Sequence, residues 1–113
     1  MINLEVKPLY ENNFDYKYVY FELYGKTYKV RRGLTCVAID ECGWAYAFYG
    51  VQPKDMARRR DKRRLSGYWR ANKGYERKIC EIDIDNIPDF DWTKTLMAAR
   101  LVQKTLPPEL INL

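Results

Sequence analysis

The sequence predicts an α+β domain, in which an antiparallel sheet of about five strands carries a C-terminal helix on one face. Three observations support this fold class. Apolar and polar residues alternate over 16–23, glycine-containing turns separate several strand-like segments, and apolar residues recur at helical spacing after Trp92. A small five-stranded barrel is the alternative. At 113 residues, 47% of them hydrophobic, the chain is expected to form a single domain, 1–113.

Two hairpins are predicted in the first half of the chain. Over 16–23, Val19, Phe21 and Leu23 share one face, and a turn at 24–26 leads into a second alternating segment at 27–31. The apolar segment 34–40 and the aromatic segment 44–51 are separated by the polar turn Asp40-Glu41-Cys42-Gly43. We expect each pair of segments to form adjacent antiparallel strands.

The second half of the chain predicts two helices and two more strands. Asp55 could cap a basic helix through Leu65, and Ser66-Gly67 would end it. Strands are expected over 68–71 and 75–84, joined by a loop at 72–74 that contains glycine. The last element is a helix over 92–104, because Trp92, Leu96, Ala99 and Val102 are spaced to dock on the sheet.

A basic segment, 54–78, is the main functional signal. It holds eleven Lys and Arg against three acids, a net charge of +8, whereas the rest of the chain holds nine against twelve, a net charge of −3. Arginine forks favour phosphate or carboxylate recognition, so the segment is expected to be exposed before the last strand and to meet a polyanion. The predicted partner-binding residues are Arg58, Arg59, Arg60, Lys62, Arg63, Arg64, Tyr68, Trp69, Arg70 and Lys73.

The tyrosines opposite Val19 and Phe21 allow two interpretations. Tyr16, Tyr18 and Tyr20 could form an open platform that stacks nucleic-acid bases, as in sheet-based RNA-binding proteins. Packing is the favoured interpretation, because tyrosine is a good strand residue whose ring packs while its hydroxyl reaches water.

Composition restricts the chemistry. The chain has no histidine, which removes Cys–His and Ser–His–Asp catalysis and the commonest zinc ligand. Three cysteines without a C-x-x-C pair indicate free thiols in the cytosol, and the sequence shows neither a secretory signal nor a membrane-spanning run. A divalent-metal site is the weaker alternative for the acids Glu81, Asp83, Asp85, Asp89 and Asp91. No metal, cofactor or catalytic residue is therefore predicted.

One pattern of turns and packing residues resembles short accessory proteins of tailed bacteriophages. It consists of VAIDECGWAYAFYG, then Pro53, Tyr68-Trp69, an isoleucine-rich strand and DWTKTL, over about residues 37–96. The chain departs from that pattern at Thr95, where serine is expected, and in its long arginine-rich spacer. The resemblance implies a host-takeover or anti-defence protein that works by binding.

These observations predict a cytoplasmic, non-enzymatic protein. Its expected partner is a host nucleic-acid-handling or defence protein, or a nucleoprotein, which it would inhibit through the basic and aromatic residues. Direct binding to DNA or RNA is the alternative, and a metal-dependent nuclease comes third. No membrane partner is expected.

Overall fold

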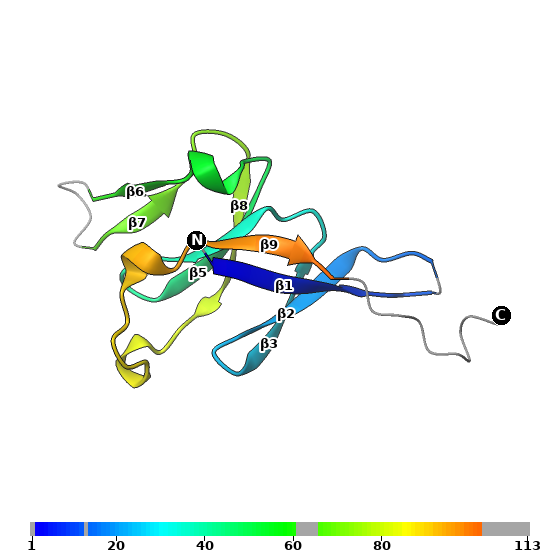
Figure 1. The fold of residues 1–113 in the computed structure, drawn as a ribbon, viewed down its shortest axis with the longest axis horizontal. Helices are drawn as coiled ribbons and strands as arrows, with labels where there is room; N and C mark the ends of the chain where they lie inside the picture. The colour runs from blue at the N-terminus through cyan, green and yellow to red at the C-terminus, as the bar shows by residue number, and fades with distance from the viewer. Residues whose placement is uncertain (1, 13, 61–65, 103–113) are drawn as a thin grey trace.

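The computed structural model describes residues 2–12, 14–60 and 66–102, which are almost entirely β-structure (Figure 1). The strands are β1 (Ile2–Leu9), β2 (Tyr18–Leu23), β3 (Lys26–Arg31), β4 (Cys36–Ile39), β5 (Trp44–Tyr49), β6 (Ala57–Arg59), β7 (Tyr68–Arg70), β8 (Tyr75–Glu81) and β9 (Met97–Leu101). Single 3-10 turns lie at η1 (Pro53–Asp55), η2 (Ile84–Asn86) and η3 (Trp92–Lys94). The described residues include no α-helix, so the predicted α+β class is wrong.

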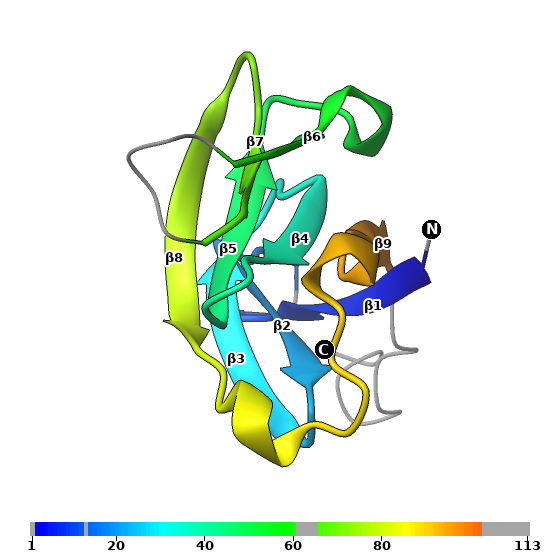
Figure 2. The ribbon, with the colours of Figure 1, turned by 90° about the vertical axis from the view of Figure 1, so that its left-hand side faces the viewer.

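Seven strands form one strongly curved sheet in the order β3-β2-β1-β9-β4-β5-β8. Only β1 and β9 run parallel, at the centre of the sheet, and the other neighbours are antiparallel. The sheet curls until its edge strands approach each other, as Figure 2 shows for β3 and β8. The Tyr49 hydroxyl on β5 donates a hydrogen bond to the Arg31 carbonyl on β3, at 2.7 Å. The result is a nearly closed, barrel-like fold with seven strands, rather than the five of the alternative prediction.

The concave face of this sheet encloses the main hydrophobic core. Alternation along β1 and β2 sends one set of side chains inward, as predicted for Val19, Phe21 and Leu23, which are all buried. The rest of the buried cluster is Leu4, Val6, Leu34, Val37, Ile39, Ala45, Ala47, Tyr49 and Met97. A second cluster lies on the outer face, where Cys36, Ala38, Phe48, Val51 and Trp69 pack together.

The predicted C-terminal helix is wrong. Only residues 92–94 turn, and Met97–Leu101 form β9, which pairs with β1 on one side and β4 on the other. The apolar spacing after Trp92 fits a helix, but this local preference is weak. Pairing with β1 and β4 at the centre of the sheet overrides it. Thr95 is buried between these elements, and its hydroxyl accepts the Ile39 N–H at 3.0 Å. The predicted residues 103–104 lie outside the described part of the chain.

The predicted basic helix is also wrong where the structure describes it. Residues 57–59 form β6 and pair with β7, and 61–65 lie outside the described residues. A segment without a wide apolar stripe has no helix face to bury, whereas strand pairing still satisfies its backbone groups.

The two predicted early hairpins are confirmed as β2–β3 and β4–β5. The strands β7 and β8 also exist but do not pair with each other, because β7 pairs with β6 and β8 with β5. Gly74 marks the separation: it has φ 77°, and a Cβ there would lie 2.0 Å from the Tyr49 carbonyl oxygen. The chain passes so close to β5 at this point that only glycine fits.

Candidate nucleic-acid interface

Within the basic segment, β6 and β7 pair as a two-stranded ribbon that projects from the sheet beside β5 and β8 (Figure 1). We call residues 57–60 and 66–70 the arginine ribbon. Its register pairs Ala57 with Arg70, Arg58 with Trp69, and Arg59 with Tyr68. Directly opposed residues share a face of a ribbon, so Arg59, Tyr68 and Arg70 lie on one face, and Arg58 and Trp69 lie on the other.

The ribbon's aromatic residues are buried, whereas its arginines are exposed. Trp69 is 7% exposed and Tyr68 is 9% exposed, while Arg58, Arg59, Arg60 and Arg70 are all exposed. Tyr68 and Trp69 were predicted to face a partner, and the structure places them inside the protein. The surface that the ribbon offers is therefore cationic.

Trp69 anchors the ribbon on the outer face of β4 and β5. Its backbone N–H donates to the carboxylate of Asp40 at 2.8 Å, and its indole N–H donates to the Trp92 carbonyl at 3.1 Å. The two indole rings meet edge to face, with centroids 6.1 Å apart. Asp40 is only 6% exposed, so its bond to the ribbon backbone is screened from water.

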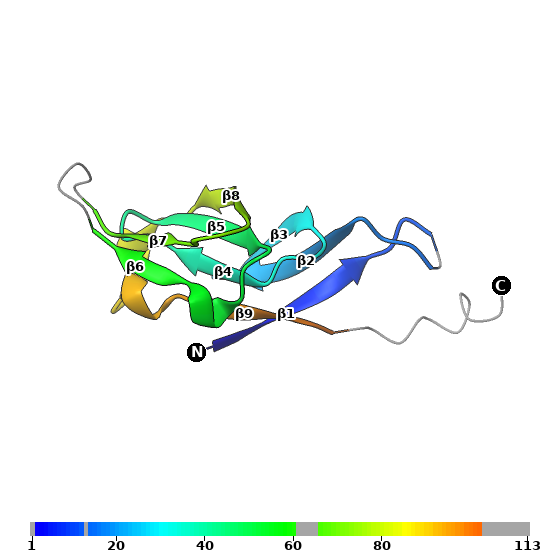
Figure 3. The ribbon, with the colours of Figure 1, turned by 90° about the horizontal axis from the view of Figure 1, so that it is seen from above.

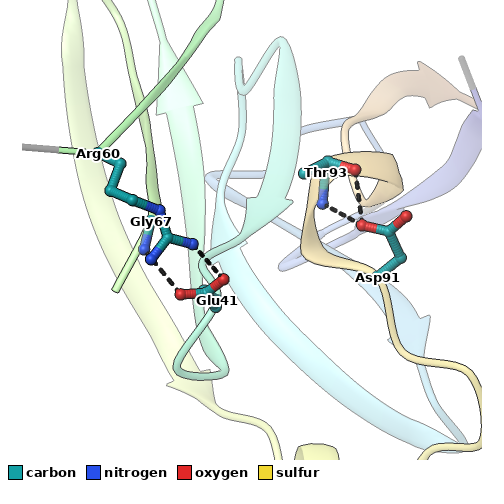
Figure 4. Close-up of polar contacts among 5 residues, drawn as sticks. All are labelled: Glu41, Arg60, Gly67, Asp91 and Thr93. Carbon is teal, nitrogen blue, oxygen red and sulfur yellow. Dashed lines mark hydrogen bonds and ion pairs between the residues drawn. The ribbon is translucent and has the colours of Figure 1, made fainter. Parts of the chain in front are cut away.

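Glu41 holds the ribbon's other end in place. Its carboxylate accepts from the Arg60 guanidinium at 2.5 Å and from the Gly67 N–H at 3.2 Å, as Figure 4 shows. The Glu41 N–H also donates to the Gly67 carbonyl, at 3.0 Å. The hydrogen bond from Arg60 is the largest cause that lowers the pKa of Glu41, followed by the one from Gly67. The positive charge of Arg60 is thus paired with the Glu41 carboxylate within the protein.

Arg58 also lies near an acid. Asp91 accepts hydrogen bonds from the Thr93 hydroxyl at 2.6 Å and the Thr93 N–H at 3.0 Å, which begin η3 (Figure 4). These bonds are the main reason that the pKa of Asp91 is lowered, and the charges of Lys94 and Arg58 lower it further. Among the described residues, Arg59 and Arg70 form no ion pair. The face that carries Arg59 and Arg70 therefore holds the ribbon's most available positive charge.

This face borders a groove of about 530 Å3 between the ribbon and strands β5 and β8. Tyr46, Tyr68 and Arg70 line it, together with Asp40, Trp69, Ala71 and Glu76. Burial is the largest cause that raises the pKa of Tyr46, so its hydroxyl stays protonated at neutral pH.

The remaining predicted site residues fall into two groups. Lys73 is exposed in the turn between β7 and β8, and Lys62, Arg63 and Arg64 lie outside the described residues. Sequence reasoning missed Asp40, Glu41 and Trp92 as anchors of the ribbon. Asp40-Glu41 had been interpreted only as turn residues, although two adjacent acids opposite a surplus of arginine were a usable signal.

Within the described ranges, no group of three or more His, Cys, Asp or Glu side chains is placed to hold a metal ion. The three cysteines are free thiols, with Cys36 buried and Cys42 exposed. No helix among the described residues is both long and apolar enough to span a bilayer. Comparisons with known protein families, curated proteins and solved structures gave no match.

Proposed function

We propose that this protein acts by binding, without a cofactor, and that the arginine ribbon engages the phosphate backbone of a nucleic acid. The observation that carries the proposal is the exposure of Arg59 and Arg70 on one ribbon face, with no ion pair to any described residue. Arginine binds phosphate through two parallel hydrogen bonds, and a two-stranded ribbon is narrow enough to enter a major groove.

The buried aromatics favour nucleic acid over a protein surface. Protein interfaces depend on aromatic anchors that become buried on binding, and Trp69 is already buried against its own chain. Phosphate contacts need only exposed cations in a fixed geometry, which the Asp40 and Glu41 bonds to the ribbon supply. These observations therefore favour direct binding of DNA or RNA, the alternative predicted from the sequence, over binding of a host protein.

A role against a host remains part of the proposal. A phage-type accessory protein that binds nucleic acid could occupy a nucleoprotein or compete with a host enzyme for its substrate. A pull-down from host lysate, with and without nuclease treatment, tests this: capture that survives nuclease digestion would favour a protein partner instead.

The direct test is the salt dependence of duplex binding. Each phosphate contact contributes a slope of about 0.9 in log K against log salt for duplex DNA. Arg59→Gln with Arg70→Gln should therefore lower the slope by about 1.8 and weaken binding to all sequences alike. Arg100→Gln is the matched control, since Arg100 is exposed on β9. An unchanged slope in the double variant would remove the ribbon from the interface.

A further inference from the structure

A second cationic and aromatic surface lies on the outer face of β1, β2 and β3. The core takes Val6, Val19 and Phe21 from these strands, so the intervening side chains point outward. The strand registers align them in two rows: Lys7 opposite Tyr20 opposite Lys29, and Leu9 opposite Tyr18 opposite Arg31. Tyr20 thus has a cation opposite it on both neighbouring strands, and Tyr18 has one, Arg31, on β3.

Two cation–ring contacts lie on or beside these rows. The Lys29 ammonium lies over the Tyr18 ring, 4.7 Å from its centroid. Just beyond the strand, the Arg32 guanidinium lies 5.4 Å from the centroid of Tyr16. Neither row contains an acid, and within the described residues Lys7, Lys29 and Arg31 form no ion pair. No described carboxylate pairs with these three cations, and Lys29 contacts only an aromatic ring that a base could share.

A hollow of about 180 Å3 lies beside Tyr20 on the same face. Lys7 and Thr27 line it, together with Glu5, Glu22, Leu4 and Phe21. The carboxylates of Glu5 and Glu22 are acceptors that suit the amino groups on base edges, and the Lys7 ammonium is a donor. The hollow thus offers polar partners beside an aromatic ring.

We propose that this outer face binds single-stranded nucleic acid, with bases stacked on Tyr18 and Tyr20 and phosphates held by Lys7, Lys29 and Arg31. Aromatic rings on a sheet with flanking cations are the arrangement by which single strands are bound with little sequence preference. The packing interpretation fits Tyr16, which packs against the main core, whereas Tyr18 and Tyr20 are half-buried on the outward face of β2. The β1–β2 hairpin extends away from the arginine ribbon (Figure 3), so the two surfaces can be tested separately.

A similar pair elsewhere in the chain lacks the same chemistry. The Lys78 ammonium lies 3.8 Å from the Trp44 centroid, and Trp44 is 42% exposed. Lys78, however, forms an ion pair with Glu81 at 2.8 Å. Its charge is already matched, which makes Trp44→Leu a suitable control variant.

The test measures binding of the full chain to dT20, to an abasic strand of the same length, and to a duplex. Wild type should bind dT20 more tightly than the abasic strand. Tyr18→Leu with Tyr20→Leu should weaken dT20 binding by about fivefold to 150-fold for each stacked base lost. Duplex binding should not change. Lys7→Gln, Lys29→Gln and Arg31→Gln together should lower the single-strand salt slope by about 2. Trp44→Leu should leave dT20 affinity unchanged.

Two measurements keep the test decisive if a variant folds poorly. Circular dichroism reports the fold, and photocrosslinking of a bromodeoxyuridine strand to the wild-type chain should map to Tyr18 or Tyr20. Equal affinity for the abasic strand, or crosslinks only on the arginine ribbon, would overturn the proposal. Preferential binding of polyglutamate would assign the face to an acidic protein and overturn it as well. If only the Arg59 and Arg70 variant loses duplex binding, that result supports the ribbon as the duplex site and shows that the outer face is a separate surface.

Discussion

At the scale of single residues, Thr95 joins three parts of the fold with one hydroxyl. The oxygen accepts the Ile39 N–H at 3.0 Å and lies within hydrogen-bonding distance of the carbonyls of Ile39, at 2.9 Å, and Trp92, at 2.8 Å. A hydroxyl donates only one proton, so it bonds one of the two carbonyls at a time.

Thr95→Val should destabilise the protein by about 1 to 3 kcal/mol, because the buried Ile39 N–H would lose its acceptor while the side-chain volume stays the same. Thr95→Ser is the control and should retain most of the stability. Denaturant unfolding measures both. If valine were as stable as threonine, the hydroxyl would have no part in holding β4 to the segment before β9.

Glu41 makes the ribbon's attachment sensitive to acid. Hydrogen bonds, first that from Arg60, lower its pKa in the folded protein below its usual value of 4.5. A lowered pKa means that the charged form stabilises the fold above that value, and this stabilisation is lost as pH falls through the folded-state pKa.

The indole rings of Trp69 and Trp92 meet beside this attachment and report it. Tryptophan fluorescence should therefore change as the pH falls below 4.5 in the wild type. Glu41→Gln should lose that transition while the other acids still titrate. Identical titrations of the two proteins would contradict a role for Glu41 as the clamp.

At the scale of elements, the sequence predicted strands best where alternation and a glycine turn coincide. Residues 18–31 show both signals, and 36–49 show a glycine turn between an apolar and an aromatic segment; both hairpins are confirmed. β1 also alternates, with Leu4 and Val6 buried, but it lacks a turn signal and was not predicted. β9 was missed for another reason. Met97 and Ala99 reach the core from a strand, but Ala99 also fits the helical spacing of Trp92, Leu96 and Val102.

The sequence predicted the positive charge of the candidate site, but it did not predict which of the ribbon's side chains face inward. Sequence alone located the arginines and their exposure, since a run of cations has no place in a core. It could not show that Trp69 faces inward, because that depends on pairing with Arg58 and on a carboxylate, Asp40, from a distant hairpin. Long-range pairing decides which face of a short strand is buried, and a three-residue strand carries too little pattern to indicate it.

At the scale of the whole molecule, one hydrogen bond helps to bring the edges of the sheet together. The Tyr49 hydroxyl donates to the Arg31 carbonyl, and its ring stacks on Tyr75 with centroids 4.8 Å apart. Burial is the largest cause that raises the pKa of Tyr49, so the hydroxyl remains a donor at neutral pH.

Tyr49→Phe should keep the stacked ring but lose this bond, at a cost of about 0.5 to 1.5 kcal/mol in the free energy of unfolding. Amide hydrogen exchange at β3 and β8 should rise more than exchange at β1 and β9. Tyr24→Phe, at an exposed turn residue, is the control. Equal exchange rates in wild type and Tyr49→Phe would show that the edges stay together without the bond.

The central position of β9 has a consequence for how the chain is made. On the ribosome, β1 emerges before the other described strands and β9 emerges after them, yet the two lie side by side and join β2 to β4 across the sheet. Until β9 is synthesised, β1 and β4 each carry an unpaired edge, and the sheet remains in two halves. Contacts so distant in sequence slow folding and expose strand edges to other chains in the meantime. Completion of this sheet therefore waits until β9, which follows the other eight described strands in the sequence, is inserted at its middle.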